Sequence, residues 1–138
     1  LFNRYDGKQV KLSDFRGKVV VVNFWEASCK TCKQEKPGLS RMARGADDDE
    51  LAVLTLAGNE SWDDVRALFP QGAPFEVFLD APAADQVIGP IGAAWGVTGW
   101  PETFVIDAKG VIRYHYVSYR DWESSIAQTC LQALIDEA

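Results

Sequence analysis

Two hydrophobic patterns alternate along the chain. Residues 18–25 (KVVVVNFW) are continuously apolar and rich in β-branched side chains, which is typical of a strand buried on both faces. Other segments place apolar residues three or four apart, as a helix with one buried face requires. The expected strands are residues 18–25, 50–57, 75–80, 102–107 and 111–117, and the expected helices are residues 29–44, 61–69, 83–95 and 121–138.

Turn residues and helix faces refine this pattern. Asp6-Gly7 predicts a hairpin within residues 1–18, and Ala108-Lys109-Gly110 predicts a second hairpin between the last two strands. Pro37 falls inside the first helix and is expected to kink it. In the last helix we expect a buried stripe with a repeat of four residues. Its members are Trp122, Ile126, Cys130 and Leu134.

The order of these elements predicts an α/β fold. Strands alternate with helices and an antiparallel pair follows, so we expect a mixed central sheet with helices on both faces. An N-terminal β-hairpin precedes this sheet. At 138 residues, without repeats or a linker, the chain is expected to form one domain over residues 1–138.

Composition and charge narrow the classes of function. Hydrophobic residues make up 47% of the chain and charged residues 25%, which is ordinary for a globular protein. The net charge is −6, with an acidic run at Asp47–Glu50 and no basic stripe, so we expect no nucleic-acid partner. No apolar run is long enough for a membrane helix, and no signal peptide is seen. Because the sequence opens at Leu1, we expect a trimmed or mature form.

The cysteines are compatible with three kinds of site: a redox centre, a zinc site or a permanent disulfide. Cys29 and Cys32 form a C-x-x-C motif between a strand and a helix, which favours a redox centre. A zinc site would need these two residues with Cys130 and His115, and a permanent disulfide across so short a loop would stabilise little. A thiolate at Cys29 would lie at a helix start, where backbone N–H groups lower its pKa. We expect Cys32 to be the more buried sulfur and predict neither metal nor cofactor.

Two further features accompany the cysteines. Glu35 is one turn beyond Cys32 on the same helix face; it is either a base for the Cys32 proton or a solvated residue paired with a neighbour such as Lys36. Trp100-Pro101 precedes a strand far along the chain, and its peptide bond is either cis or an ordinary trans bond.

These features together resemble the thioredoxin fold, in its extracytoplasmic TlpA/ResA/DsbE-like branch. The resemblance rests on LSDFRGKVVVVNFW leading into the cysteine pair, on Glu35 and Pro37, and on GVTGWPETFVIDAKGVIRY. It also includes an extra β-α stretch at 61–80 and covers nearly the whole chain. Three positions depart from the family pattern: Glu26, Ser28 and Lys30.

The resemblance implies roles for the site residues. It implies that Cys29 attacks a disulfide, that Cys32 resolves the intermediate, that Glu35 assists, and that Pro101 is cis and packs near the sulfurs. We expect the substrate surface to include Trp25, Trp100, Lys30 and Thr31.

The resemblance also implies a biological setting. Members are usually membrane-tethered reductants outside the cytoplasm, and their commonest substrate is the haem-binding cysteine pair of apocytochrome c. We therefore expect a periplasmic or extracytoplasmic monomer, with an N-terminal anchor beyond the given sequence and a membrane-embedded thiol–disulfide reductase as electron donor. The alternatives are a general disulfide reductase or isomerase with other targets, and a redox-inert binding module.

Overall fold

The computed structural model describes residues 2–4, 8–59, 61–70, 72–73 and 75–138. Its elements follow one another in the expected order, with one short 3-10 helix added before the first long strand. They are β1 (Phe2–Arg4), β2 (Gln9–Val10), η1 (Leu12–Phe15), β3 (Val19–Trp25), α1 (Lys30–Gly45), β4 (Leu51–Ala57), α2 (Trp62–Leu68), β5 (Glu76–Leu79), α3 (Pro90–Ala94), β6 (Glu102–Ile106), β7 (Ile112–Val117) and α4 (Ser125–Glu137).

The described strands form one mixed sheet in the order β2-β1-β5-β4-β3-β6-β7. β3 pairs in parallel with β4 and antiparallel with β6, so it lies inside the sheet, next to the middle strand β4. β6 and β7 form the predicted C-terminal hairpin. β1 and β2 pair antiparallel, as the expected N-terminal hairpin requires, while its Asp6-Gly7 turn lies outside the described residues. The prediction of a mixed central sheet is confirmed.

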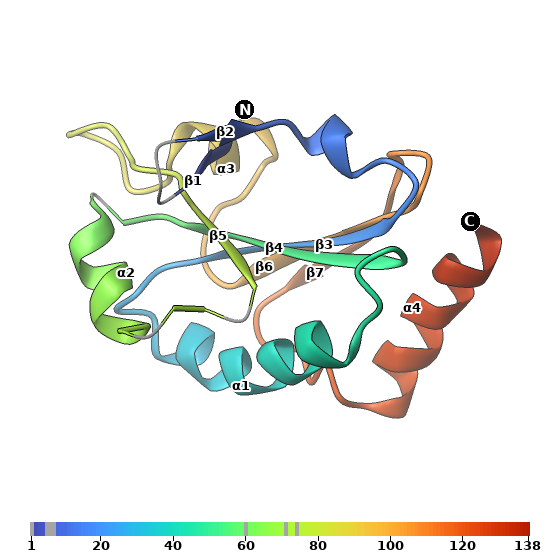
Figure 1. The fold of residues 1–138 in the computed structure, drawn as a ribbon. Coiled ribbons are helices and arrows are strands. Elements are labelled where there is room, and N and C mark those ends of the chain that lie inside the picture. Colours follow the sequence, from blue (N-terminus) through green and yellow to red (C-terminus); the bar gives the residue numbers. More distant parts are fainter. Residues whose placement is uncertain (1, 5–7, 60, 71, 74) are drawn as a thin grey trace.

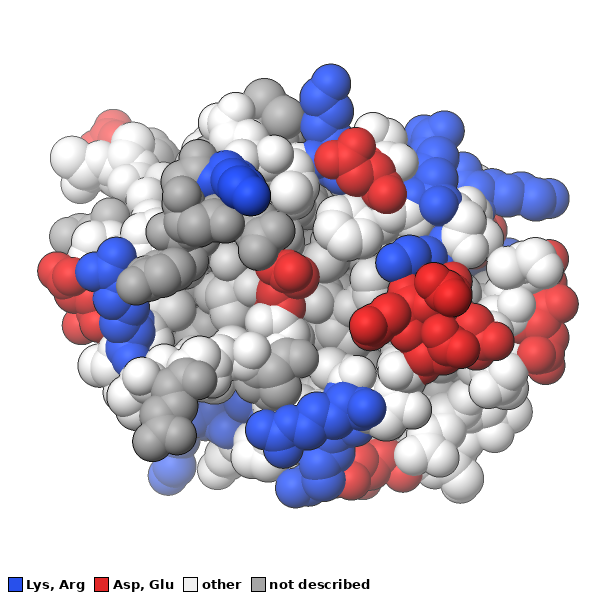
Figure 2. Space-filling view, viewed as in Figure 1, with Lys and Arg blue, Asp and Glu red and all other residues white. Residues whose placement is uncertain are grey.

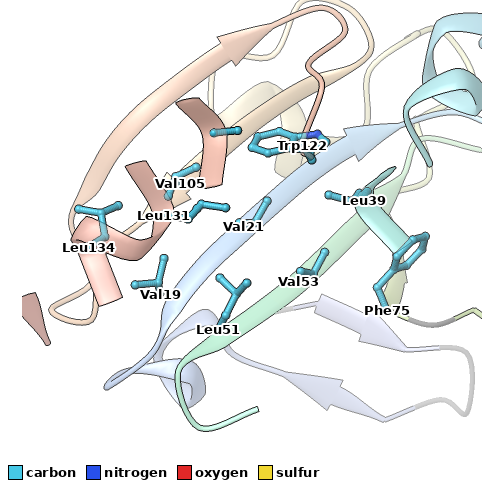
Figure 3. Close-up of a cluster of buried hydrophobic side chains, with 11 residues drawn as sticks. Val19, Val21, Leu39, Leu51, Val53, Phe75, Val105, Trp122, Leu131 and Leu134 are labelled. Atoms are coloured by element: carbon cyan, nitrogen blue, oxygen red, sulfur yellow. The ribbon is translucent and has the colours of Figure 1, made fainter. Parts of the chain in front are cut away.

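Helices cover both faces of this sheet (Figure 1). Alternate residues of β3 point to opposite faces, and Val19 and Val21 pack against α1 and α4. Figure 3 shows this layer, in which Leu131 and Leu134 of α4 lie over the strands. Val20 and Val22 point to the other face. The side chains packed around them include Leu12 and Phe15 of η1 and Ile91 of α3.

The helix predicted over residues 83–95 is much shorter than expected. Only Pro90–Ala94 is helical, and turns and bends occupy the segment before it. The start is fixed by Asp80, whose carboxylate accepts the backbone N–H groups of Ile91 at 2.9 Å and Gly92 at 2.8 Å. The residue that directly follows β5 therefore caps this helix from outside it, so the local pattern did not reveal where the helix begins.

The predicted buried stripe of the last helix was only partly right: Leu134 is buried, but Ile126 is exposed and Cys130 is partly exposed. The helix begins after Ser124, whose side chain accepts the N–H of Ala127 at 3.2 Å. Trp122 is buried but lies in the turn before the helix, so counting in fours from it selects Ile126, which is 75% exposed. The buried positions of α4 are Ala127, Leu131 and Leu134.

Charged side chains of both signs are interspersed on the face shown in Figure 2. The acidic run at Asp47–Glu50 lies in the exposed turn between α1 and β4. Across the described residues, no helix has both the length and the apolar character needed to cross a membrane.

Candidate active site

The two neighbouring cysteines meet at the start of α1. Cys29 is the N-cap residue of this helix and forms a disulfide with Cys32, with 5.2 Å between their Cα atoms. The backbone N–H of Cys32 donates to Cys29 Sγ at 3.1 Å, so a helix-end donor is already directed at this sulfur. Cys29 is partly exposed and Cys32 is fully buried. Cys32 is thus the more buried sulfur, as predicted.

A small apolar cluster encloses the buried sulfur. Cys32 packs in a group with Trp25, Ala27, Ala57 and Val65, which come from β3, β4, α2 and the turn after β3. The partly buried side chains of Trp62 and Trp100 pack against the same group. Because these elements converge at one end of the central strands, Cys32 is shielded while Cys29 stays open to the surface.

The proline loop lies beside this cluster. The Trp100-Pro101 bond is cis, which agrees with the family resemblance. Trp100 packs closely over Gly58: a Cβ atom on that glycine would lie 2.8 Å from the indole ring. Gly58 is therefore needed for the observed position of the Trp100 ring.

Glu102 holds the backbone of this loop. Its Oε2 accepts the N–H groups of Thr98 at 2.8 Å and Gly99 at 3.2 Å. Its Oε1 lies 2.7 Å from Nε2 of His115, whose ring stacks on Phe104 with 4.2 Å between ring centroids. Glu102 is only 2% exposed, so this buried carboxylate links the loop to β7.

Glu35 lies in a second buried polar cluster, under the start of α1. It is 1% exposed, so the alternative of a solvated helix residue is wrong. Asn23 Nδ2 donates to Glu35 Oε1 at 2.9 Å, and the backbone N–H of Arg120 donates to Oε2 at 2.8 Å. The buried indole N–H of Trp122 also acts on the carboxylate, although it makes no hydrogen bond of standard geometry within the described structure.

Lys36 completes this cluster. Its Nζ donates to Asn23 Oδ1 at 2.7 Å and lies 4.9 Å from the centroid of the Trp25 ring. Burial raises the pKa of Glu35 above its ordinary value, while the donors and the positive charge of Lys36 partly oppose the rise. Burial lowers the pKa of Lys36 to about 8, partly opposed by the Glu35 charge. Both groups are thus shifted toward neutral pH.

A polar rim surrounds Cys29. The Glu26 carboxylate accepts the Asn59 side-chain amide at 2.8 Å and the backbone N–H and hydroxyl of Ser28. Asn59 Oδ1 in turn accepts the N–H of Ala27 at 3.1 Å. Glu26 and Ser28, two of the positions that depart from the family pattern, therefore act together to order the turn before Cys29.

The structure places the predicted site residues at different depths. Lys30 is exposed and Thr31 is partly exposed beside Cys29, and Trp100 and Pro101 lie in the facing loop. Trp25 is fully buried, so its place is beneath the sulfurs rather than on the surface. Cys130 is a partly exposed free thiol. Among the described residues, no three His, Cys, Asp or Glu side chains form a group that could hold a metal ion.

Three site residues were missed by the sequence analysis: Asn23, Lys36 as a buried cation, and Glu102. Asn23 is a polar residue within the apolar strand KVVVVNFW, and that interruption was an available signal. Glu102 directly follows the proline of the loop, but no local pattern distinguishes it from an ordinary strand residue. Its partners become visible only in the fold: two loop amides, and His115, which lies opposite Phe104 in the β6–β7 hairpin.

The mixed sheet, the helix-start cysteine pair and the adjacent cis-proline together define a thioredoxin-fold thiol–disulfide oxidoreductase. A family model described as "AhpC/TSA family" matches residues 2–115. The chain belongs to this family, and among its thioredoxin-like members it belongs with the proteins named DsbE and ResA.

Individual relatives agree with this placement. The chain is 37% identical over 134 residues to the thiol:disulfide interchange protein DsbE of Pseudomonas fluorescens biotype C, covering 95% of this chain and 70% of that protein. It is 30% identical to the thiol–disulfide oxidoreductase ResA of Geobacillus thermodenitrificans, covering 78% of this chain and 59% of that protein. The chain thus spans roughly 60 to 70% of the length of these two relatives.

A solved structure supports the fold over almost the whole chain. The putative thiol:disulfide interchange protein DsbE from Chlorobium tepidum superposes with a TM-score of 0.82 at 25% identity. The match covers 97% of this chain and 91% of that structure.

Proposed function

We propose that this protein is a single thioredoxin-like domain that reduces protein disulfides outside the cytoplasm. The observation that carries the proposal is the Cys29–Cys32 disulfide at the start of α1, with one sulfur open and the other enclosed. An open sulfur can attack a substrate, and an enclosed neighbour can displace the product without meeting other thiols.

The proposed cycle moves two electrons from the protein to the substrate. The Cys29 thiolate attacks one sulfur of a substrate disulfide, which breaks the S–S bond and leaves a mixed disulfide. Cys32 loses its proton and attacks Cys29 Sγ, so the second substrate thiolate departs and the Cys29–Cys32 disulfide forms. The backbone N–H of Cys32 and the N-terminal end of α1 stabilise the thiolate of Cys29 in the first step.

Glu35 is the proposed base for the second step. A fully buried Cys32 thiol ionises reluctantly, and a carboxylate with a raised pKa is matched to accept its proton near neutral pH. The shared helix face places Glu35 one turn from Cys32.

The proposed substrate surface surrounds Cys29. Lys30 and Thr31 border it on α1, and Trp100 and Pro101 border it on the facing loop. Trp25 lies beneath and supports Cys32 from the interior. The polar pair Glu26 and Ser28 forms the remaining rim, so this rim accepts a polar substrate segment more readily than an aromatic rim would.

The proposed substrate is a protein disulfide such as the haem-binding cysteine pair of apocytochrome c. This choice follows the resemblance to the DsbE and ResA group. A membrane-embedded thiol–disulfide reductase is the proposed electron donor, and the protein is proposed to act as a monomer in the periplasm or an equivalent compartment, held there by an N-terminal anchor.

The first experiment tests the redox pair itself. Free thiols are counted before and after mild dithiothreitol, and the two sulfurs of the Cys29–Cys32 disulfide should appear in addition to Cys130. Cys32→Ser should then trap a disulfide-containing C-x-x-C-H peptide on Cys29, while Cys29→Ser should trap none. A protein that gains no thiols is a redox-inert module, and the proposal fails.

The direction of electron flow needs a separate measurement. The reduction potential of the pair is determined against glutathione or dithiothreitol buffers. A potential well below those of oxidising periplasmic proteins supports a reductant, whereas a high potential would make the protein an oxidase.

A further inference from the structure

Lys36 is a buried cation directly beside the proposed base. It is 7% exposed, its Nζ donates to Asn23 Oδ1 at 2.7 Å, and it lies over the Trp25 ring. Burying an ammonium group is costly unless charges and hydrogen bonds compensate it. Lys30 and Lys33 of the same helix are exposed and already contribute to solubility. Solubility therefore does not explain why Lys36 is buried.

Lys36 fixes the orientation of the Asn23 side chain. A lysine ammonium can only donate, so the oxygen of the Asn23 amide must face it. The amide nitrogen then points the other way, and it donates to Glu35 Oε1 and to Thr103 Oγ1, both at 2.9 Å. A flipped amide would place an oxygen against the carboxylate.

Glu35 therefore receives donors on both oxygens. Asn23 donates to one and the backbone of Arg120 to the other, a pattern that favours the ionised carboxylate. A protonated Glu35 would need an acceptor for its own proton, and Asn23 cannot offer one while Lys36 holds its oxygen.

We propose that Lys36 is a positioning residue for disulfide exchange: acting through Asn23 and through its charge, it holds Glu35 as a carboxylate that is ready to take the Cys32 proton. This inference rests on the proposed role of Glu35 as the base. When the proton arrives, Cys32 attacks Cys29 Sγ, the bond from Cys29 to the substrate sulfur breaks, and the substrate leaves as a thiolate.

Neutral polar groups face Glu35 from the neighbouring elements. The segment before α4 contributes the backbone N–H of Arg120 and the Trp122 indole, while the Arg120 guanidinium lies over the Tyr116 ring, 4.1 Å from its centroid. β3 and β6 contribute the neutral side chains Asn23 and Thr103. Within the described structure, Lys36 is the cation whose charge stabilises ionised Glu35.

The test compares Lys36→Met with Lys33→Met, which removes the same charge from an exposed position of the same helix. The Glu35 carboxyl is titrated by carbon-13 NMR in the oxidised protein. Lys36→Met should raise the Glu35 pKa, and the rate of mixed-disulfide resolution at pH 7 should fall roughly tenfold and recover at higher pH. Lys33→Met should leave the Glu35 pKa unchanged. If Glu35 has the same pKa in both variants, Lys36 does not position Glu35.

A second variant tests the interaction between Glu35 and Lys36 through the pKa of Lys36. In Glu35→Gln, the Lys36 ammonium loses its counter-charge, so its own pKa should fall below the parent value of about 8. An unchanged Lys36 titration would overturn the proposal even if Lys36→Met failed to fold.

The outcomes also separate this inference from the proposed function. If Glu35→Gln slows resolution while Lys36→Met behaves like Lys33→Met, the base assignment stands and the Lys36 proposal is wrong. If Glu35→Gln resolves as fast as the parent, Glu35 is not the base and the role given to Lys36 falls with it.

Discussion

Two buried carboxylates lie at the same end of the central sheet, but on its opposite faces. Glu35 is 1% exposed and Glu102 is 2% exposed. Glu35 contacts Asn23, which is paired across the strands with Thr103; the next pair in the register is Phe24 with Glu102. Because side chains alternate along a strand, neighbouring residues point to opposite faces of the sheet: one face is covered by α1 and the other by α3.

Their partners differ in kind. Glu102 accepts two backbone N–H groups of the proline loop and a histidine at the surface, whose side chain is 41% exposed. Glu35 is enclosed with a lysine that is itself buried. Glu102, held by loop amides, therefore anchors the backbone of the proline loop. Glu35, enclosed with Lys36, is instead suited to exchanging a proton.

The largest expected effect is on stability when each carboxylate is replaced by leucine. Glu35→Leu leaves Lys36 without its counter-charge and leaves donors from Asn23 and Arg120 unpaired, so it should lower the free energy of unfolding by about 3–5 kcal/mol. Glu102→Leu loses hydrogen bonds from the loop amides and should cost about 1–3 kcal/mol. Urea unfolding at pH 7 measures both values. A larger cost for Glu102→Leu would reverse the comparison.

Of the two carboxylate clusters, only the one that contains Glu35 and Lys36 should make stability depend on pH in the alkaline range. The pKa of Lys36 is about 8 in the folded protein against an ordinary 10.5, so between these values the unfolded chain binds more protons and folding gains stability as pH rises. Lys36→Met lacks this gain. The difference in unfolding free energy between the parent and Lys36→Met should therefore change in the parent's favour by up to about 3 kcal/mol between pH 8 and 10.5.

The measurement is urea unfolding of the parent and of Lys36→Met across that range. Subtracting the two curves cancels the other ionising groups that they share. A difference that stays constant with pH would show that Lys36 titrates as an exposed lysine does.

The smallest effect is expected for His115→Leu on the Glu102 side. Leucine can still pack on Phe104, and Glu102 keeps its two loop amides, so the free energy of unfolding should change by about 1 kcal/mol or less. The pH profile of mixed-disulfide resolution should coincide with that of the parent in stopped-flow experiments. A shifted profile would mean that this anchor also takes part in proton transfer.

Local sequence features predicted much of the fold and the two sulfurs. The apolar run of β3 and the C-x-x-C motif after it are short-range signals, so both were identified correctly. In α4 only Leu134 of the predicted stripe is a buried helix position, because Ser124 sets the start of the helix and the stripe was counted from Trp122, which lies outside it. The start of α3 was missed because Asp80, which directly follows β5, caps it from outside the helix.

The environment of Glu35 could not be predicted from its neighbours in sequence. Its burial depends on Asn23, 12 residues away, and on Arg120, 85 residues away. A helix pattern alone describes Lys36 as a solvated residue, yet the fold places it over Trp25. Long-range packing therefore decides which of the charged residues of α1 can act in the chemistry.

The most direct test of the account compares Glu35→Gln with Glu102→Gln in a two-step reaction of the reduced proteins with Ellman's reagent. All the proteins carry Cys130→Ser, which removes the free thiol that would also react. Attack by Cys29 then releases the first thionitrobenzoate, and resolution by Cys32 releases the second. We predict that Glu35→Gln slows only the second step near neutral pH, by roughly 100-fold, and recovers at higher pH, while Glu102→Gln follows the parent. Equal second-step rates for Glu35→Gln and the parent from pH 6 to 8 would contradict the account.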